Sequence, residues 1–378
     1  MRILLAGVSV RALAQSAVRA GHDVACLDFF GDRDLPSEAP KVSMCGAGCE
    51  TYEASALADL APRLEYDALA YVASLENHPD LVARLAGDRP IIGNHPDTLE
   101  KVRNWTGLAA FCRRAGVDMP PTLAETELPA ASALSGDWLL KPVKSGGGHS
   151  IRPWEGGRPE PGWYLQQRVD GIAASAVFEA DGTRCRVLGV SEQLIGLGRF
   201  GAAGYRYCGN LYPLEPQAGN GKLGQWIRET TNKLTVHFGL RGVNGLDFVI
   251  PPIGNPILIE VNPRPPASAE LMESAHGKSI FSAHLSPLSE PPAHRDTAGR
   301  VHGKAIVFAV SDVTTPDTSS WLGMERRDIP EPGQIIGAGH PICTVLASGV
   351  NRRECLDRLR KGADAVRKDT GDAQPDGR

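Results

Sequence analysis

Short apolar runs separated by helical or turn-rich segments make up the beginning of the chain. The runs occupy residues 2–8, 24–30, 68–74 and 90–92. Strands that are buried on both faces of a parallel sheet are apolar along their whole length, and the segments between them supply the crossovers. The pattern therefore predicts a parallel α/β domain over residues 1–100.

The first 24 residues have the basic residue, apolar run and small residues of a signal peptide, but their pattern favours another structure. The apolar run extends only from Ile3 to Val10 before Arg11 interrupts it. A buried strand, a turn and a helix that ends at Gly21 account for this pattern better. No run approaches the roughly 18 apolar residues of a transmembrane helix, so we expect no membrane partner.

The central part of the chain predicts two hairpins. The first is a strand, a glycine-rich loop and a strand in DWLLKPVKSGGGHSIRPW, and the second joins GVNGLDFVI to PILIEVN through a short turn. The remaining predicted elements are helices at 105–115 and 222–238 and strands at 163–169 and 174–178.

Prolines after Leu285 indicate a linker to two further apolar strands, at 303–310 and 341–347. We divide the chain into an N-terminal α/β domain, a central domain of two lobes, a small β-rich tail domain, and a C-terminal helix with a flexible tail. These parts are residues 1–100, 101–284 (lobes of about 105–170 and about 171–284), 285–352 and 353–378.

Composition limits the possible partners and the compartment. The 378 residues are 42% hydrophobic and 22% charged, as in a globular chain of several domains, and the net charge of −4 gives no basic field for nucleic acid. Only Cys45 and Cys49 lie close together among eight cysteines, without a companion pair or a histidine cluster. This usage is typical of reduced thiols in a cytoplasmic protein.

The stretch ILIEVNPRPP, residues 257–266, holds the clearest candidate chemistry. In an extended segment Glu260, Asn262 and Arg264 lie on one face, and their neighbours point the other way. Asp247, on the strand before, would add a third oxygen ligand through the hairpin. Magnesium prefers a few carboxylates together with waters and phosphate oxygens, and the planar fork of arginine matches phosphate geometry. We predict a metal and phosphate site here.

Two other groups of residues are candidates for ligand contacts. The glycine-rich loop Gly146, Gly147, Gly148 lies between two strands, so it fits neither a Walker loop nor a dinucleotide fingerprint, but its amides can cover phosphates, with Lys141 and Lys144 as point charges. The second group follows the carboxyl ends of the N-terminal strands, where ligands of parallel sheets collect. The candidates for contacts with an acceptor substrate are Ser9, Glu76, Asn77 and Asn94. Turns and helix caps explain polar residues at such positions equally well.

The order of a lysine-bearing strand, a glycine-rich loop, a hinge strand, LDFVI and IEVNPRP resembles the ATP-grasp superfamily over roughly residues 100–280. The resemblance implies an ATP-grasp fold with a Rossmann-like N-terminal domain. It also implies that two lobes clamp ATP together with one or two Mg²⁺ ions, for which Mn²⁺ could substitute. In the implied reaction a carboxylate is activated as an acyl phosphate and is then attacked by an amine.

The same resemblance implies roles for individual residues. Glu260 would bridge both metals, Asp247 and Asn262 would each hold one, and Arg264 would steady the acyl phosphate. Lys141 would touch phosphate, and the backbone of the hinge would bind the adenine edge. The hinge residues are Gln166, Gln167 and Val169.

The sequence departs from the family pattern at three places. Asn104-Trp105 stands where an acid and the first phosphate lysine are usual, and we predict Arg103 or Lys101 as the substitute. The hinge begins with glutamine rather than glutamate. No acid follows Gly171, which leaves the ribose contact unassigned.

The phrases SLENHP, GVSEQLIG, YRYCGNLYPL and GHPICTVLA are similar to the predicted carboligase branch, which includes tyramine–glutamate ligase-like proteins. The resemblance implies a carboxylate–amine ligase forming a C–N (amide) bond in one-carbon cofactor (methanofuran-type) biosynthesis. Its substrates would be a small-molecule carboxylate and an amine, and the protein could assemble as a homodimer. The alternatives are a carboxylase-like enzyme that forms carboxyphosphate and an ATP-binding regulator without turnover.

Overall fold

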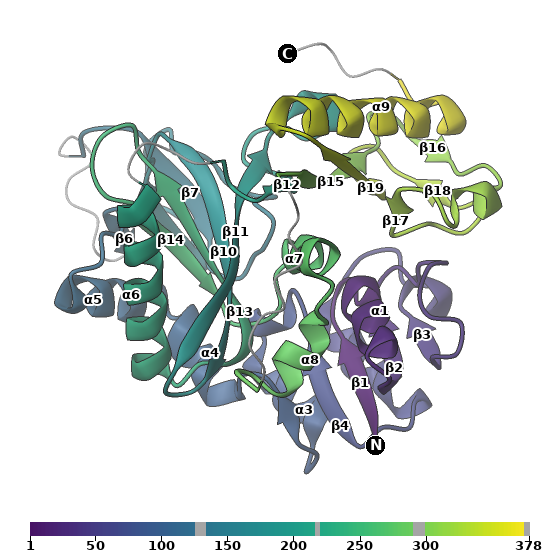
Figure 1. The fold of residues 1–378 in the computed structure, drawn as a ribbon, viewed down its shortest axis with the longest axis horizontal. Helices are drawn as coiled ribbons and strands as arrows, with labels where there is room; N and C mark the ends of the chain where they lie inside the picture. Colours follow the sequence, from purple (N-terminus) through teal and green to yellow (C-terminus); the bar gives the residue numbers. More distant parts are fainter. Residues whose placement is uncertain (125–133, 216–219, 290–298, 374–378) are drawn as a thin grey trace.

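The computed structural model describes residues 1–124, 134–215, 220–289 and 299–373. Three large sheets organise it, one parallel with five strands and two antiparallel with four and eight strands. Figure 1 shows the N-terminal sheet in purple and blue below the long teal and green strands, with the C-terminal helix in yellow above. This mixed α/β and α+β architecture confirms the predicted fold class.

The N-terminal sheet has the strand order β3-β2-β1-β4-β5 and is parallel throughout. Its central strand is apolar on both faces because Ile3 and Leu5 pack into one core while Leu4 and Ala6 pack into another. The strands are β1 (Arg2–Ala6), β2 (Asp23–Asp28), β3 (Lys41–Ser43), β4 (Ala68–Tyr71) and β5 (Ile91–Ile92). The predicted parallel α/β sheet is thereby confirmed.

Helices cover both faces of this sheet. α1 packs against β2 and also against helix α8 (Ile280–Leu285), whereas α2 and α3 pack on the opposite face. The helices of this part are α1 (Arg11–Arg19), α2 (Ala54–Leu60), α3 (Pro79–Ala86) and α4 (Pro96–Arg103).

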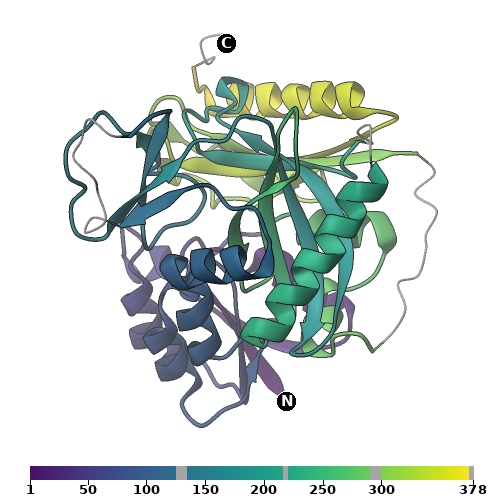
Figure 2. The same cartoon turned by 90° about the vertical axis from the view of Figure 1, so that its left-hand side faces the viewer.

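The small lobe consists of one helix and a four-stranded sheet of order β6-β9-β7-β8, seen at the upper left of Figure 2. Its helix α5 (Trp105–Ala115) has the predicted bounds because both ends are capped locally. The Asn104 side chain accepts a hydrogen bond from the amide of Gly107, and Gly116 adopts a left-handed φ of +64°. The strands are β6 (Thr122–Ala124), β7 (Trp138–Pro142), β8 (Arg152–Pro153) and β9 (Trp163–Gln167).

The large lobe contributes five strands to the eight-stranded sheet of order β14-β13-β10-β11-β12-β15-β19-β17. Both predicted hairpins are confirmed, since β7 pairs with β8 and β13 pairs with β14 in antiparallel register. The strands are β10 (Ile172–Asp181), β11 (Cys185–Ile195), β12 (Tyr207–Tyr212), β13 (Arg241–Ile250) and β14 (Ile257–Asn262). The helices are α6 (Asn220–Phe238), α7 (Ala269–His276) and α8 (Ile280–Leu285).

The tail strands continue the same sheet across the predicted boundary at 284/285, because β15 pairs with the edge that β12 offers. Helix α9 packs on β15 and β19. The tail elements are β15 (Val301–Phe308), β16 (Val313–Thr314), β17 (Arg326–Arg327), β18 (Ile335–Ile336), β19 (Pro341–Gly349) and α9 (Arg352–Thr370). Much of the predicted proline-rich linker, at 290–298, and the end of the predicted flexible tail, at 374–378, lie outside the described residues.

Among the described residues, no helix combines the length and the apolar character needed to cross a bilayer. All eight cysteines are free thiols.

Candidate active site

A cavity of about 1720 Å³ is lined by residues of both antiparallel sheets and by loop and helix residues of the N-terminal domain. Most of the residues predicted for the site line it, although they come from segments far apart in the sequence. These are Ser9, Asn77, Arg103, Lys141, Lys144, Gly146, Gly147, Gly148, Gln166, Gln167, Val169, Asp247, Glu260, Asn262 and Arg264.

The floor of the cavity is the hairpin of β13 and β14. Asp247 lies opposite Glu260, and Gly245 lies opposite Asn262. The amide of Asn262 donates to an Asp247 carboxylate oxygen at 2.9 Å. The predicted face of alternating residues therefore exists, with both carboxylates and the amide on it.

Burial, followed by repulsion between two carboxylates, governs the electrostatics of this face. Burial and the nearby Glu260 raise the pKa of Asp247 to about 6, against the lowering effect of hydrogen bonds from Ser175 and Asn262 and of the Arg264 charge. A divalent cation between the two carboxylates would relieve that repulsion, so the residues fit Mg²⁺.

The donor set also discriminates between metals. Among the described residues, no group of three histidine, cysteine, aspartate or glutamate side chains could hold a metal ion. Two carboxylates and an amide are too few for a closed zinc site. They suit magnesium, which completes its octahedron with water and phosphate oxygens.

Arg264 lies just beyond the end of β14 and is held from two sides. Its Nε donates to Glu76 at 3.0 Å, and its Nη2 donates to the side-chain oxygen of Asn262 at 3.0 Å. Glu76 is 1% exposed and lies in a short 3₁₀ helix, Leu75–Asn77, of the N-terminal domain. Glu76, predicted to contact the acceptor substrate, instead positions Arg264 and is absent from the described residues that line the cavity.

Arg103, the predicted substitute for the missing lysine, lies between the glycine-rich loop and the metal face. Its Nη1 lies 3.5 Å from a Glu260 oxygen, and its Nε donates to Asn77 at 2.9 Å. Burial lowers the pKa of Arg103, but the carboxylates of Glu260 and Glu76 outweigh burial and raise it. A permanent cation is therefore held beside the predicted metal ligand.

The lysine strand and the hinge strand are linked across the small lobe. Lys141 Nζ donates to the side-chain oxygen of Gln166 at 2.6 Å, and the amide of Gln166 donates to Thr122 at 3.2 Å. Burial lowers the pKa of Lys141, and the charges of Glu260 and Asp247 oppose that effect. Lys144 is exposed.

The glycine-rich loop folds against the segment that precedes β12. The carbonyl of Gly147 accepts a hydrogen bond from the amide of Tyr207 at 2.9 Å. Gly148 has a φ of +70°, and a Cβ there would lie 2.0 Å from the carbonyl oxygen of Tyr205. A glycine is therefore required at this contact.

Asn94 has a different environment from the one predicted. Its amide donates to Asn244 at 2.7 Å and to the carbonyl of Pro263 at 3.0 Å, while its oxygen accepts from the amide of Arg241 at 2.8 Å. It is 1% exposed and does not belong to the described residues that line the cavity. These bonds attach the N-terminal domain to the large sheet, so we leave Asn94 out of the candidate site.

Residues 104–268 match the model of the ATP-grasp domain family. The chain has the ATP-grasp fold. It is 23% identical over 366 residues to an uncharacterized protein of Methanocaldococcus jannaschii, covering 92% of this chain and 88% of that protein. It is also 23% identical over 330 residues to the carbamoyl phosphate synthase large chain of Deinococcus deserti, covering 76% of this chain but only 31% of that one.

Several solved structures superpose over nearly the whole chain. A biotin carboxylase–β-γ-ATP complex from Campylobacter jejuni gives a TM-score of 0.70 at 14% identity, covering 98% of this chain and 91% of that one. Carboxyaminoimidazole ribonucleotide synthase from Aspergillus clavatus, complexed with ATP, gives 0.70 at 15% identity, covering 97% and 98%. An L-amino acid ligase from Bacillus licheniformis gives 0.65 at 15% identity, covering 97% of each chain.

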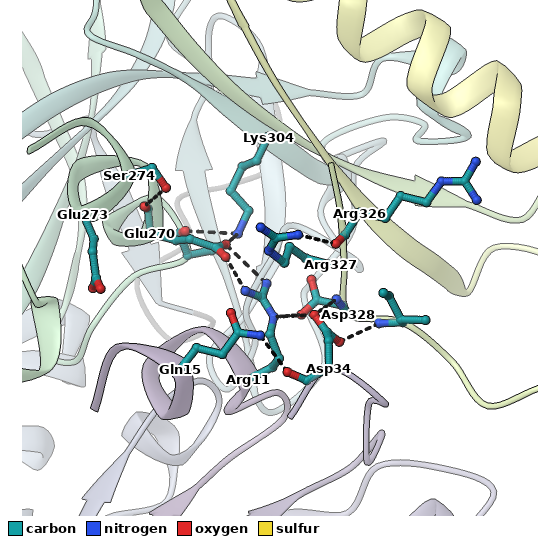
Figure 3. A network of polar contacts seen from close by, with 12 residues as sticks. Arg11, Gln15, Asp34, Glu270, Glu273, Ser274, Lys304, Arg326, Arg327 and Asp328 are labelled. Carbon is teal, nitrogen blue, oxygen red and sulfur yellow. Dashed lines mark hydrogen bonds and ion pairs between the residues drawn. The ribbon is translucent and has the colours of Figure 1, made fainter. Parts of the chain in front are cut away.

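A second group of charged residues, all but one of which line this cavity, was missed by sequence reasoning. We call it the polar cluster, and Figure 3 shows most of it, at the junction of α1, α7 and the tail strands. Its members lie on five separate segments, so no local sequence motif predicts that they come together. They are Arg11, Asp32, Asp34, Glu270, Lys304 and Asp328.

Proposed function

We propose that the protein is an ATP- and Mg²⁺-dependent carboxylate–amine ligase that releases ADP and phosphate. The observation that carries the proposal is the shared face of Asp247, Glu260 and Asn262 on the cavity floor, with Arg264 beside it. An ATP-grasp fold supplies the frame, but a fold alone does not set the reaction.

Each residue has a physical role in this proposal. Asp247, Glu260 and Asn262 would hold Mg²⁺, which when bound neutralises phosphate charge. Lys141 and Arg103 place two cations on the cavity wall near these ligands. Arg264 is fixed by Glu76 and Asn262 before any substrate arrives, so its charge needs little reorganisation when charge develops on a transferring phosphoryl group.

Support for the C–N bond-forming reaction comes from the amino acid ligase among similar structures and from the sequence phrases of the predicted carboligase branch. The support for a role in methanofuran-type biosynthesis comes from those sequence phrases and not from the structures. The carboxylase-like alternative is favoured by a specific observation, the similarity to biotin carboxylase and to carboxyaminoimidazole ribonucleotide synthase.

ADP release with a panel of amino acids and amines, each with and without glutamate-type carboxylates, tests the proposal against bicarbonate. We expect ADP formation that needs a carboxylate and an amine together and is abolished in Asp247→Asn. ADP formation with bicarbonate alone would favour the carboxylase-like alternative. Nucleotide binding without ADP formation under any condition would favour a regulator.

A further inference from the structure

The polar cluster is held together by two cations that are fully used within it. Arg11 is 1% exposed, donates to Asp328 at 2.9 Å and to Glu270, and lies 3.5 Å from Asp34. Lys304 Nζ, 4% exposed, donates to Glu270 at 2.7 Å and to the carbonyl of Ala267. These two cations are therefore not available to bind a substrate anion.

The remaining member of the polar cluster, Asp32, is an acid whose charge has no ion-pair partner among the described residues. Asp32 lines the cavity and is 5% exposed. Its Oδ2 is buried and has no hydrogen-bond partner among the described residues. Burial and the like charges of Asp328, Asp28 and Asp34 raise the pKa of Asp32, and the smaller opposing effect of the Arg11 charge does not cancel them.

Two neighbouring arginines do not change this balance. Arg326 donates to Asp369 at 2.8 Å and lies over the ring of Trp321, and Arg327 donates to the carbonyls of Met324 and Arg326. Counting only the polar cluster, four carboxylates face two cations. This end of the cavity therefore favours a cation.

A buried carboxylate without a partner is costly, so it calls for an explanation. A divalent metal is a poor one, because the neighbouring carboxylates of Asp34, Glu270 and Asp328 are already paired with Arg11. An ammonium group, with its single charge and three donors, matches one uncompensated carboxylate.

We infer that Asp32 is the anionic centre of a subsite for a primary ammonium group of the substrate, at the end of the cavity formed by the polar cluster. This inference rests on the proposed function, since it names the chemical class of one ligase substrate. Asp32 binds the ammonium group, and Arg11 positions the carboxylates around it.

Titration of the full-length protein with n-butylammonium chloride, by calorimetry at constant ionic strength, tests the subsite. Neutral n-butanol and anionic butyrate are the matched probes. We expect wild-type protein to bind butylammonium and neither other probe, and Asp32→Asn to weaken that binding by about tenfold or more, the effect of losing a charge-assisted bond.

Asp28→Asn is the control variant. Asp28 is buried like Asp32, at 1% against 5% exposed, and lies nearby, but it accepts hydrogen bonds from the amides of Val10 and Gly31 and is absent from the described cavity lining. Asp28→Asn should lower the Tm and keep butylammonium binding. Asp32→Asn should keep or raise the Tm, because it removes an unpaired buried carboxyl, and lose the binding.

Equal butylammonium affinity in Asp32→Asn and wild type, or no preference of the wild type for butylammonium over butanol, would overturn the inference. If the Asp32→Asn variant does not fold, proton release on binding of butylammonium to the wild-type protein tests the inference instead. Binding of the cation lowers the pKa of Asp32, so calorimetry in two buffers of different ionisation enthalpy should detect released protons. Binding without proton release would count against Asp32. None of these measurements needs ATP, so they stand even if the proposed ligase reaction fails.

Discussion

Glu76 and Arg264 form an ion pair, with 3.0 Å between Nε and Oε1, that joins the N-terminal domain to the end of β14. Their side chains are 2% and 11% exposed. The second oxygen of Glu76 has no hydrogen-bond partner among the described residues. Besides the nearby Asn262, Arg264 thus depends for its orientation on one carboxylate nearly 200 residues away in sequence.

Glu76→Gln should lower turnover while leaving ATP affinity close to that of the wild type. The amide keeps the shape but loses the charge that orients Arg264, and misplacement of a catalytic group by about 1 Å can cost on the order of 100-fold in rate. Single-turnover ADP formation and ATP binding, measured side by side, check this. Asp80→Asn, an exposed acid of the same domain, should behave as wild type. A Glu76→Gln variant with normal turnover would contradict the positioning role.

Gly148→Ala should weaken ATP binding, by about tenfold if the added strain is near 1.4 kcal/mol. The new Cβ would lie 2.0 Å from the Tyr205 carbonyl oxygen at a φ of +70°, so the loop must leave the segment that precedes β12. Gly146→Ala in the same loop is the control, because its Cβ would meet no described atom within 4 Å. Equal ATP affinity of the two variants would remove this contact from the account of the site.

His284 should make the fold sensitive to acid. It is 3% exposed, its Nδ1 accepts from the amide of Val243 at 2.9 Å, and burial lowers its pKa to about 4. At pH values between the folded-state pKa of about 4 and the unfolded-state pKa of about 6.5, His284 is protonated in the unfolded chain but neutral in the folded chain. The stabilising effect of neutral His284 is complete above that window and is lost as pH falls, by about 3 kcal/mol in total.

Urea unfolding of wild type and His284→Asn at pH 7 and pH 5 measures this. Asparagine keeps an acceptor for Val243 but does not titrate, so the wild type should lose about 2 kcal/mol more of its unfolding free energy on going to pH 5. Parallel losses in both proteins would show that His284 does not set the acid sensitivity.

The elements that were predicted well are those whose signals are local. The bounds of α5 follow from the cap at Asn104 and the left-handed Gly116. The face that holds Glu260 and Asn262 follows from the period of two in a strand, and its pairing with Asp247 follows from a short hairpin. Pattern and turn chemistry suffice in each of these cases.

What could not be predicted depends on contacts between distant segments. Arg11 interrupts an apolar run in the sequence, yet it is buried in the structure, where Glu270 and Asp328 compensate its charge. Asn94 and Glu76 were recognised as polar residues after strands, but their partners lie about 150 and nearly 190 residues away. The pairing of β12 with β15 is likewise set by a free sheet edge.

The roles of Glu260 and Arg264 are the central claim, and they predict two different failures on one strand face. Glu260→Gln removes a charged metal ligand, so magnesium-dependent ATP binding should weaken and added magnesium should partly restore it. Arg264→Ala should keep ATP affinity and lose roughly 2.7–4 kcal/mol of transition-state stabilisation, the cost of one oxyanion-stabilising donor. Glu229→Gln, exposed on α6, is the control.

Magnesium titration of ATP binding, followed by single-turnover ADP formation in both variants, tests this claim most directly. The account predicts weakened, metal-rescued binding in Glu260→Gln and normal binding with slow turnover in Arg264→Ala. Normal metal dependence in Glu260→Gln, or lost ATP affinity with normal turnover of bound ATP in Arg264→Ala, would contradict it.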